Sequence, residues 1–155
     1  MTNDFFAPIG ISGPYFNECD LFVRRGAPEG ELSLDLGIDL PTDHEYFEED
    51  GVLGLANEMK VRVSLTESPS DGQPREAMHV RLSMGGVVTM PMDVDADRDE
   101  LETYLLLNGI SLFYSSARSY IEVLTGQSPM GRFTIPPIDP KKYLDMAKNE
   151  GAAEA

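Results

Sequence analysis

Apolar and polar residues alternate along four segments of the chain, which is the pattern of half-buried strands. Residues 18–25, 31–40, 58–67 and 77–84 carry an apolar side chain at every second position, and this period places them on one side of an extended chain. The alternating positions are Cys19, Leu21 and Val23; Leu32, Leu34, Leu36, Ile38 and Leu40; Met59, Val61, Val63 and Leu65; and Met78, Val80, Leu82 and Met84. One face of the sheet is therefore expected to lie on a core and the other in water.

The segments that interrupt or join these strands differ in character. Residues 68–74, SPSDGQP, are dense in turn formers, so the third and fourth strands are predicted to form an antiparallel hairpin. Residues 41–55 are acidic yet contain Tyr46 and Phe47, and we interpret this long connection as a crossover loop. Gly85-Gly86 interrupts the fourth strand, where glycine permits a bulge or a close approach of another element.

A helical period follows the strands. Apolar residues recur every three or four positions between residues 100 and 125, which predicts one long helix; they are Leu106, Ile110, Phe113, Ala117, Ile121 and Leu124. Asp97 followed by Glu100 has the form of a capping box, and Gly126 stands where a left-handed glycine often ends a helix. Asn108-Gly109 leaves open whether this helix is continuous, kinked or divided.

The last part of the chain is predicted to be extended and then helical. Residues 132–139 include prolines, and residues before proline avoid the helical region. Asp139 is the predicted N-cap of a short helix that starts at Pro140. The fold class is therefore α+β: a four-stranded antiparallel sheet with one solvated face, followed by a long helix and a short C-terminal helix. We expect one domain over residues 1–150, large enough to bury roughly 70% of its unfolded surface, and a flexible tail at 151–155.

Charge restricts the kinds of partner. The formal net charge is −15, from 27 acidic and 12 basic residues, so nucleic acid and anionic membrane surfaces are repelled and basic partners are favoured. Cys19 is the one cysteine, which excludes an intramolecular disulfide. The N-terminal residues lack the pattern of a signal peptide, and no segment approaches the roughly 20 apolar residues that span a bilayer. A cytoplasmic location without membrane insertion is expected.

An acidic run before the long helix raises the possibility of a calcium-dependent binding module. Asp93, Asp95 and Asp97 form a D-x-D-x-D pattern, which opens the calcium loop of EF-hand proteins. The glycine of that loop would fall at Arg98 and its glutamate at Tyr104, so the pattern is incomplete. The favoured interpretation is an acidic helix start, which the helix dipole stabilises.

Other catalytic or cofactor patterns are not found in the sequence. His44 and His79 stand at no zinc-ligand spacing with each other or with Cys19. No nucleophile signature such as G-x-S-x-G occurs. We therefore expect no cofactor, no metal and no enzymatic activity.

Three stretches together resemble the SecB export chaperone family. They are SMGGVVTM, NGISLFYSSARSYIEVLTGQ and FTIPPIDPKKYL, and the similarity extends over about residues 59–146. The resemblance implies a protomer with a four-stranded sheet and two helices that assembles as a dimer of dimers, a homotetramer. It implies an ATP-independent holdase that binds unfolded or nascent polypeptides for protein export and translocation, with SecA as the receiving motor. A dedicated chaperone for one partner, such as an antitoxin, is the alternative within this class.

The resemblance and the surplus of large apolar residues predict a client-binding surface. We expect it to be built from the crossover loop, the long helix and the extended segment, at Tyr46, Phe47, Leu53, Phe113, Tyr114, Tyr120, Phe133 and Ile135. For each of these residues, a place in the core or in a subunit interface is the alternative interpretation. The long helix carries more large apolar residues than one small sheet can cover.

The water-facing side of the sheet is the predicted partner-binding face, at Glu18, Asp20, His79 and Arg81. In the export family this face is acidic and contacts SecA, with a glutamate four residues before the Gly-Gly pair. Here Arg81 occupies that position, and Lys60 and Arg62 add further positive charge. This reversal weakens the expectation of SecA docking and leaves the holdase interpretation intact. Cross-strand charge pairing is the structural alternative.

Overall fold

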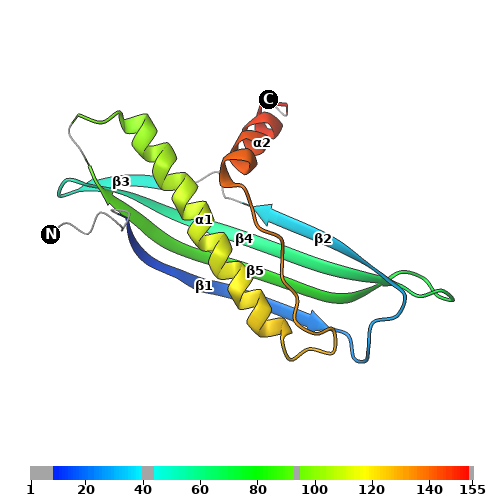
Figure 1. Ribbon diagram of the computed structural model, residues 1–155. Helices are drawn as coiled ribbons and strands as arrows, with labels where there is room; N and C mark the ends of the chain where they lie inside the picture. Colours follow the sequence, from blue (N-terminus) through cyan, green and yellow to red (C-terminus); the bar gives the residue numbers. More distant parts are fainter. Residues whose placement is uncertain (1–8, 40–43, 93–94, 154–155) are drawn as a thin grey trace.

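The computed structural model describes residues 9–39, 44–92 and 95–153, which form one antiparallel sheet with a long helix across one face (Figure 1). The elements are β1 (Gly10–Val23), β2 (Glu31–Asp39), β3 (Glu45–Glu49), β4 (Val52–Ser68), β5 (Arg75–Pro91), α1 (Arg98–Thr125) and α2 (Pro140–Ala153). The strand order is β1-β5-β4-β2, and β3 pairs with the start of β4. The predicted α+β class is confirmed.

The described residues contain five strands, one more than the sequence pattern predicted. The additional strand, β3, lies within the segment that we interpreted as a crossover loop, and it pairs antiparallel with β4. Asp50 and Gly51 both have positive φ, 52° and 74°, which is the backbone of a tight hairpin turn. An Asp-Gly pair is a strong hairpin signal, but a five-residue strand is too short for its alternation to stand out.

The core lies between the sheet and α1. The alternating residues of β4 and β5 that face the helix are buried, and so are the helix residues Ile110, Phe113, Ala117 and Ile121. The close approach expected at Gly85-Gly86 is present at Gly86, because a Cβ atom there would lie 2.9 Å from Phe113 Cζ. Glycine therefore lets the ring of Phe113 lie directly on the sheet.

Helix α1 is continuous for 28 residues, about 42 Å, and does not break at Asn108-Gly109. Gly109 is buried, and a Cβ atom at this position would lie 3.2 Å from Val88 Cγ2, so the glycine allows close packing of helix on sheet. Asp97 is the N-cap as predicted, and its Oδ1 accepts from the Asp99 N–H at 2.9 Å. Gly126 was expected to be left-handed, but its φ is −59° because the chain continues in a right-handed turn beyond the helix.

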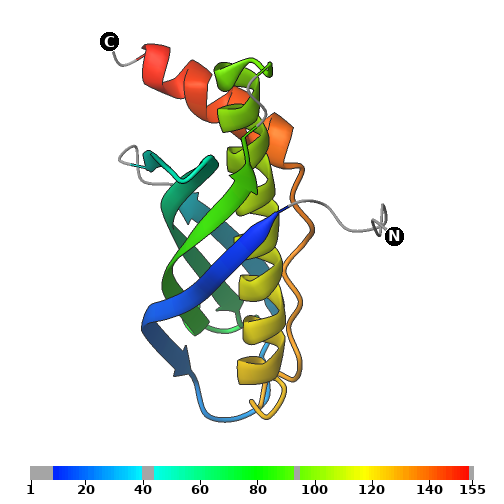
Figure 2. The ribbon, with the colours of Figure 1, turned by 90° about the vertical axis from the view of Figure 1, so that its left-hand side faces the viewer.

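The extended segment 132–139 runs back beside α1, as both views show (Figures 1 and 2). Four hydrogen bonds between described residues connect it to α1, and three of them are 2.9 Å or shorter. The Tyr114 hydroxyl donates to Pro136 O at 2.6 Å, Arg118 Nε donates to Ile135 O at 2.9 Å, and the Phe133 N–H donates to Thr125 Oγ1 at 2.9 Å.

Helix α2 follows this extended segment. Asp139 is its N-cap as predicted, because Asp139 Oδ1 accepts from the Lys142 N–H at 3.1 Å. The Tyr143 hydroxyl donates to Ile38 O at 3.0 Å, which ties α2 to β2. The helix continues to Ala153 and so includes part of the segment expected to form a tail.

Candidate functional site

Four of the eight predicted client-binding residues lie in the core of the protomer. Leu53, Phe113 and Ile135 have no exposed surface, and Tyr114 is 2% exposed. Burial raises the pKa of the Tyr114 hydroxyl, while the nearby Arg118 opposes that rise. The structure therefore gives these four residues the core position that was the alternative interpretation, and in this conformation they offer no surface to a client.

Tyr46 and Phe47, from the predicted crossover loop, are partly exposed but lie on opposite faces of β3. Tyr46 faces the helix, where its hydroxyl donates to Glu102 O at 3.1 Å. Burial, followed by the charge of Glu102, raises the pKa of Tyr46 to about 12. The Phe47 ring covers Gly54 so closely that a Cβ atom there would overlap it. The two aromatic residues therefore cannot line the same groove in this conformation.

Tyr120 lies in an open apolar groove between α1 and β1. Its ring stacks on Phe16 with centroids 4.2 Å apart and an interplanar angle of 25°. Leu112 and Val123 continue the lining, and Val123 is 70% exposed. The remaining lining residues are small: Ser115, Ser116 and Ser119.

The sequence contains a helical pattern for this groove, and the predicted client-binding set did not include it. Leu112, Ser116, Ser119 and Val123 recur at helical spacing, which places them along one side of the helix. Phe16 was missed because β1 begins at Gly10, well before the segment whose alternation was recognised. Register shifts in β1 between Ser12 and Tyr15 and between Phe16 and Glu18 disrupt its alternation, so the period-two pattern is lost there.

The helix-bearing face also has uncovered apolar residues at its other flank. Leu32 and Leu34 of β2 are 43% and 45% exposed and pair with Glu67 and Leu65 of β4. A helix with its side chains is about 10–12 Å wide, whereas the outer strands of a four-stranded sheet lie about 14 Å apart. One helix therefore cannot cover the whole face, and both flanks keep apolar surface.

The four predicted partner-face residues lie on the sheet face opposite α1. Asp20 Oδ2 is 3.1 Å from His79 Nε2 and 3.6 Å from Arg81 Nη1. His79 Nδ1 is 3.1 Å from Glu76 Oε2. Glu18 lines a shallow hollow on the same face with Lys60, Asp39 and other charged residues. The structure thus brings Glu18, Asp20, His79 and Arg81 together.

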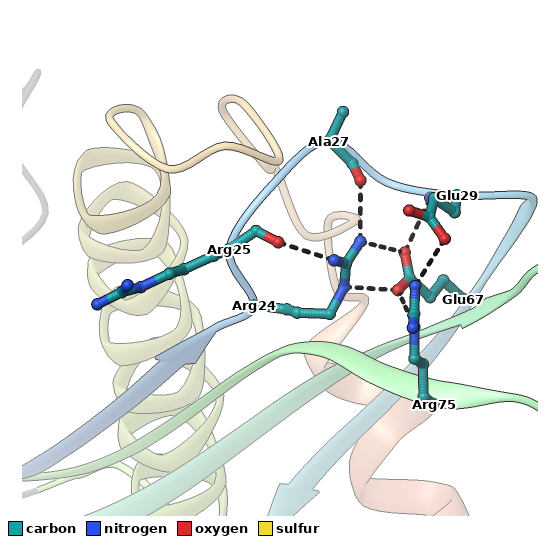
Figure 3. A network of polar contacts seen from close by, with 6 residues as sticks. All are labelled: Arg24, Arg25, Ala27, Glu29, Glu67 and Arg75. Carbon is teal, nitrogen blue, oxygen red and sulfur yellow. Dashed lines mark hydrogen bonds and ion pairs between the residues drawn. The ribbon is translucent and has the colours of Figure 1, made fainter.

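A buried carboxylate, Glu67, joins the β1–β2 connection to the β4–β5 hairpin (Figure 3). Its side chain has no exposed surface and forms 2.6 Å ion pairs with Nε of Arg24 and Nε of Arg75. The Glu29 N–H donates to Glu67 Oε2 at 2.8 Å. That backbone hydrogen bond first, and then the two guanidinium groups, lower the pKa of Glu67 to about 2 despite its burial. This network fixes one end of the sheet.

The described residues contain no group of three or more His, Cys, Asp or Glu side chains that could hold a metal ion. Of the acidic run considered for calcium, Asp93 lies outside the described residues and Asp97 serves as the cap of α1. Within the described part of the chain, neither helix is long and apolar enough to cross a membrane.

The strand order, the long helix across one face, the extended segment beside it and the short C-terminal helix define the fold of the SecB-like chaperones. Among solved structures, the chain is similar to the Mycobacterium tuberculosis SecB-like chaperone Rv1957, solved in complex with a ChAD peptide from the Rv1956 HigA1 antitoxin. The TM-score is 0.54 at 15% sequence identity, over 85% of this chain and 91% of that chain.

A protein of unknown function from Streptococcus agalactiae aligns with a TM-score of 0.43 at 8% identity, over 83% of this chain and 96% of that chain. This likeness is too distant to carry an argument. No protein-family model and no curated protein matches the sequence.

Proposed function

We propose that the protein is an ATP-independent holdase chaperone that binds apolar segments of unfolded polypeptides. The observation that carries this proposal is the open groove beside α1, where Phe16, Tyr120, Leu112 and Val123 present apolar surface to solvent. The SecB-like fold supports it, since the similar solved structure is a chaperone holding a peptide. Tyr120 is the one residue of the predicted client set that lines this groove.

The groove suits weak and adaptable binding. Burial of one large apolar side chain contributes about 1.5–3 kcal/mol, and the cost of association offsets much of the sum for a short segment. The small serines at the groove leave room for side chains of different shapes. A single groove therefore binds reversibly, and retention of a long client needs several grooves on one assembly.

This need for several grooves favours an oligomer. We extend the proposal to a homotetramer built as a dimer of dimers in the cytoplasm, with no cofactor and no catalytic activity. The net charge of −15 keeps such apolar surfaces from aggregating with one another.

The proposal also concerns the kind of client. A dedicated chaperone for one antitoxin or a similar partner is favoured over a general export chaperone by two observations. The similar solved structure holds an antitoxin peptide, and Arg62 and Arg81 place positive charge on the sheet face that is acidic in export chaperones. SecA docking is therefore the less supported form of the proposal.

Light scattering of a chemically unfolded test protein, diluted into buffer with and without this protein, tests the holdase function. We expect suppressed scattering without nucleotide, and static light scattering of the protein alone should give the mass of a tetramer. If the protein is folded and oligomeric but leaves scattering of the test protein unchanged, general holdase activity is refuted.

Two matched substitutions on β1 test the groove itself. Phe16→Ser removes an aromatic ring from the groove, whereas Phe22→Ser removes a similarly exposed ring, 42% against 38%, from the opposite face. We expect Phe16→Ser to weaken suppression and Phe22→Ser to preserve it. Equal effects of the two substitutions would contradict the assignment of the groove.

A further inference from the structure

Asn57 is a polar side chain buried in the middle of the core. It stands between Leu55 and Met59 in the row of β4 residues that face α1, and it is 6% exposed. Among the described residues, neither Oδ1 nor Nδ2 of Asn57 has a hydrogen-bond partner. A buried amide without a partner lowers stability, and such groups are rare in native proteins. Packing alone therefore does not explain why an asparagine occupies this position.

Asn57 lies at the boundary between two parts of the core. The larger cluster contains the buried apolar residues of α1 from Ile110 onward. The buried residues of the smaller cluster are Leu53, Leu55, Val88, Met90 and Leu105. Three elements cross the boundary at a residue that has no apolar side chain: Asn57 in β4, Gly86 in β5 and Gly109 in α1. Apart from the partly buried Leu106, which packs against both clusters, the two halves of α1 therefore rest on separate parts of the sheet.

Gly109 makes α1 easier to bend at this boundary. Glycine inside a helix is less favourable than alanine, because its backbone loses more conformational freedom. Sharp kinks occur where a side chain inserts into the backbone hydrogen bonds of a helix. A Cβ atom at position 109 would lie 4.0 Å from Asn57 Nδ2, so the amide of Asn57 lies next to this point of the helix.

The backbone hydrogen bond that faces Asn57 joins the Gly109 N–H to Leu105 O, because an α-helix pairs residue i with residue i−4 and both residues are buried. If α1 bends away from the sheet, this sheet-facing bond opens. A side-chain amide has both an acceptor and a donor, so Asn57 Oδ1 can accept from the Gly109 N–H while Nδ2 donates to Leu105 O. On the same turn, Asn108 Nδ2 donates to Tyr104 O at 2.8 Å, so that carbonyl keeps a partner as well.

We propose that residues 98–108 of α1 form a hinged lid over the smaller cluster, and that the lid opens by bending α1 at Gly109, where the Asn57 amide binds the freed backbone groups. In the closed state the lid packs on the smaller cluster and the amide has no partner. In the open state the amide replaces one backbone hydrogen bond of the helix. Bending therefore costs less free energy than it would over an apolar side chain.

Two polar contacts connect the lid to β3 in the closed state, at the end of the sheet where Figure 1 shows the start of α1. The Tyr46 hydroxyl donates to Glu102 O at 3.1 Å, and Arg98 Nη1 lies 2.9 Å from Glu48 Oε2 in an exposed ion pair. Exposed ion pairs contribute little, so packing on the smaller cluster is the main force that closes the lid. Opening exposes apolar surface around Leu53, away from the proposed client groove. The motion is a property of the protein alone and does not depend on holdase activity.

Thiol labelling of buried cysteines in the full-length protein tests the inference. Leu53→Cys places a thiol in the smaller cluster and Leu82→Cys places one in the larger cluster, at positions that are 0% and 2% exposed. Both variants also carry Cys19→Ser, because Cys19 is exposed. We expect the Leu53→Cys variant to be labelled at least about tenfold faster, since lid opening is a local event that needs less free energy than global unfolding.

Adding Asn57→Leu, which keeps the branching of the side chain and removes the amide, tests the hinge. We expect it to slow labelling of the Leu53→Cys variant by about tenfold more than that of the Leu82→Cys variant, because the open state loses two hydrogen bonds. Equal slowing of both variants would mean that Asn57 only weakens the core, and the inference would be wrong. If Asn57→Leu fails to fold, Asn57→Ala removes the amide without adding volume and takes its place.

Met59→Leu is the matched control, because Met59 is the next α1-facing residue of β4 and belongs to the larger cluster. It is expected to speed labelling of the Leu82→Cys variant and to leave labelling of the Leu53→Cys variant unchanged, since the larger cluster stays packed when the lid opens. If both variants are labelled faster by the same factor, the smaller cluster becomes exposed only by global unfolding, and the inference is overturned.

Discussion

A substitution at Phe113 distinguishes a core role of this residue from a client-binding role, because the sequence allowed both. In the structure its side chain has no exposed surface and lies directly on Gly86. Phe113→Ala is therefore expected to remove a buried ring and leave a cavity. Deletions of a buried phenyl group cost about 3–5 kcal/mol. The upper part of this range applies, since Gly86 has no side chain that could relax into the space.

Urea unfolding followed by circular dichroism measures this loss. With a slope of about 2 kcal/mol per molar urea for a domain of this size, a loss in the upper part of this range lowers the midpoint by about 2–2.5 M. Client retention, measured where the variant remains folded, is expected to be unchanged. A loss of stability below about 1 kcal/mol combined with weakened client retention would refute the core assignment.

Two further predictions concern the Glu67 network and the β3–β4 hairpin. The pKa of Glu67 is lowered to about 2, so its stabilising contribution is present above about pH 4.5 and is lost as the pH falls through 2. When the unfolding free energy is measured against pH in acid, the dependence for Glu67→Gln should be smaller by about one proton. Gly54→Ala should displace the Phe47 ring and lower the unfolding free energy by about 1–3 kcal/mol. If the two residues are in contact, the double variant with Phe47→Ala should lose less unfolding free energy than the sum of the losses in the two single variants.

Local patterns predicted most of the elements correctly, because they act within a few residues. Alternation along the central parts of β4 and β5 identified the buried side of these strands before the packing partner was known. Asp97 and Asp139 identified the helix starts, since a capping carboxylate satisfies N–H groups two or three residues away. The hairpin strand β3 was not predicted, because its five residues are too few to establish a period-two alternation.

The sequence by itself thus determined the fold class, the helix starts and the buried side of β4 and β5. Only the tertiary structure decided which aromatic residues are core and which are surface. Phe113 and Tyr120 belong to the same helix, yet the first is buried and the second lines a groove, because α1 is narrower than the sheet and covers only its middle. The opposition of Arg62 and Arg81 likewise depends on the register of two strands, which is fixed by packing across the whole sheet rather than by either strand alone.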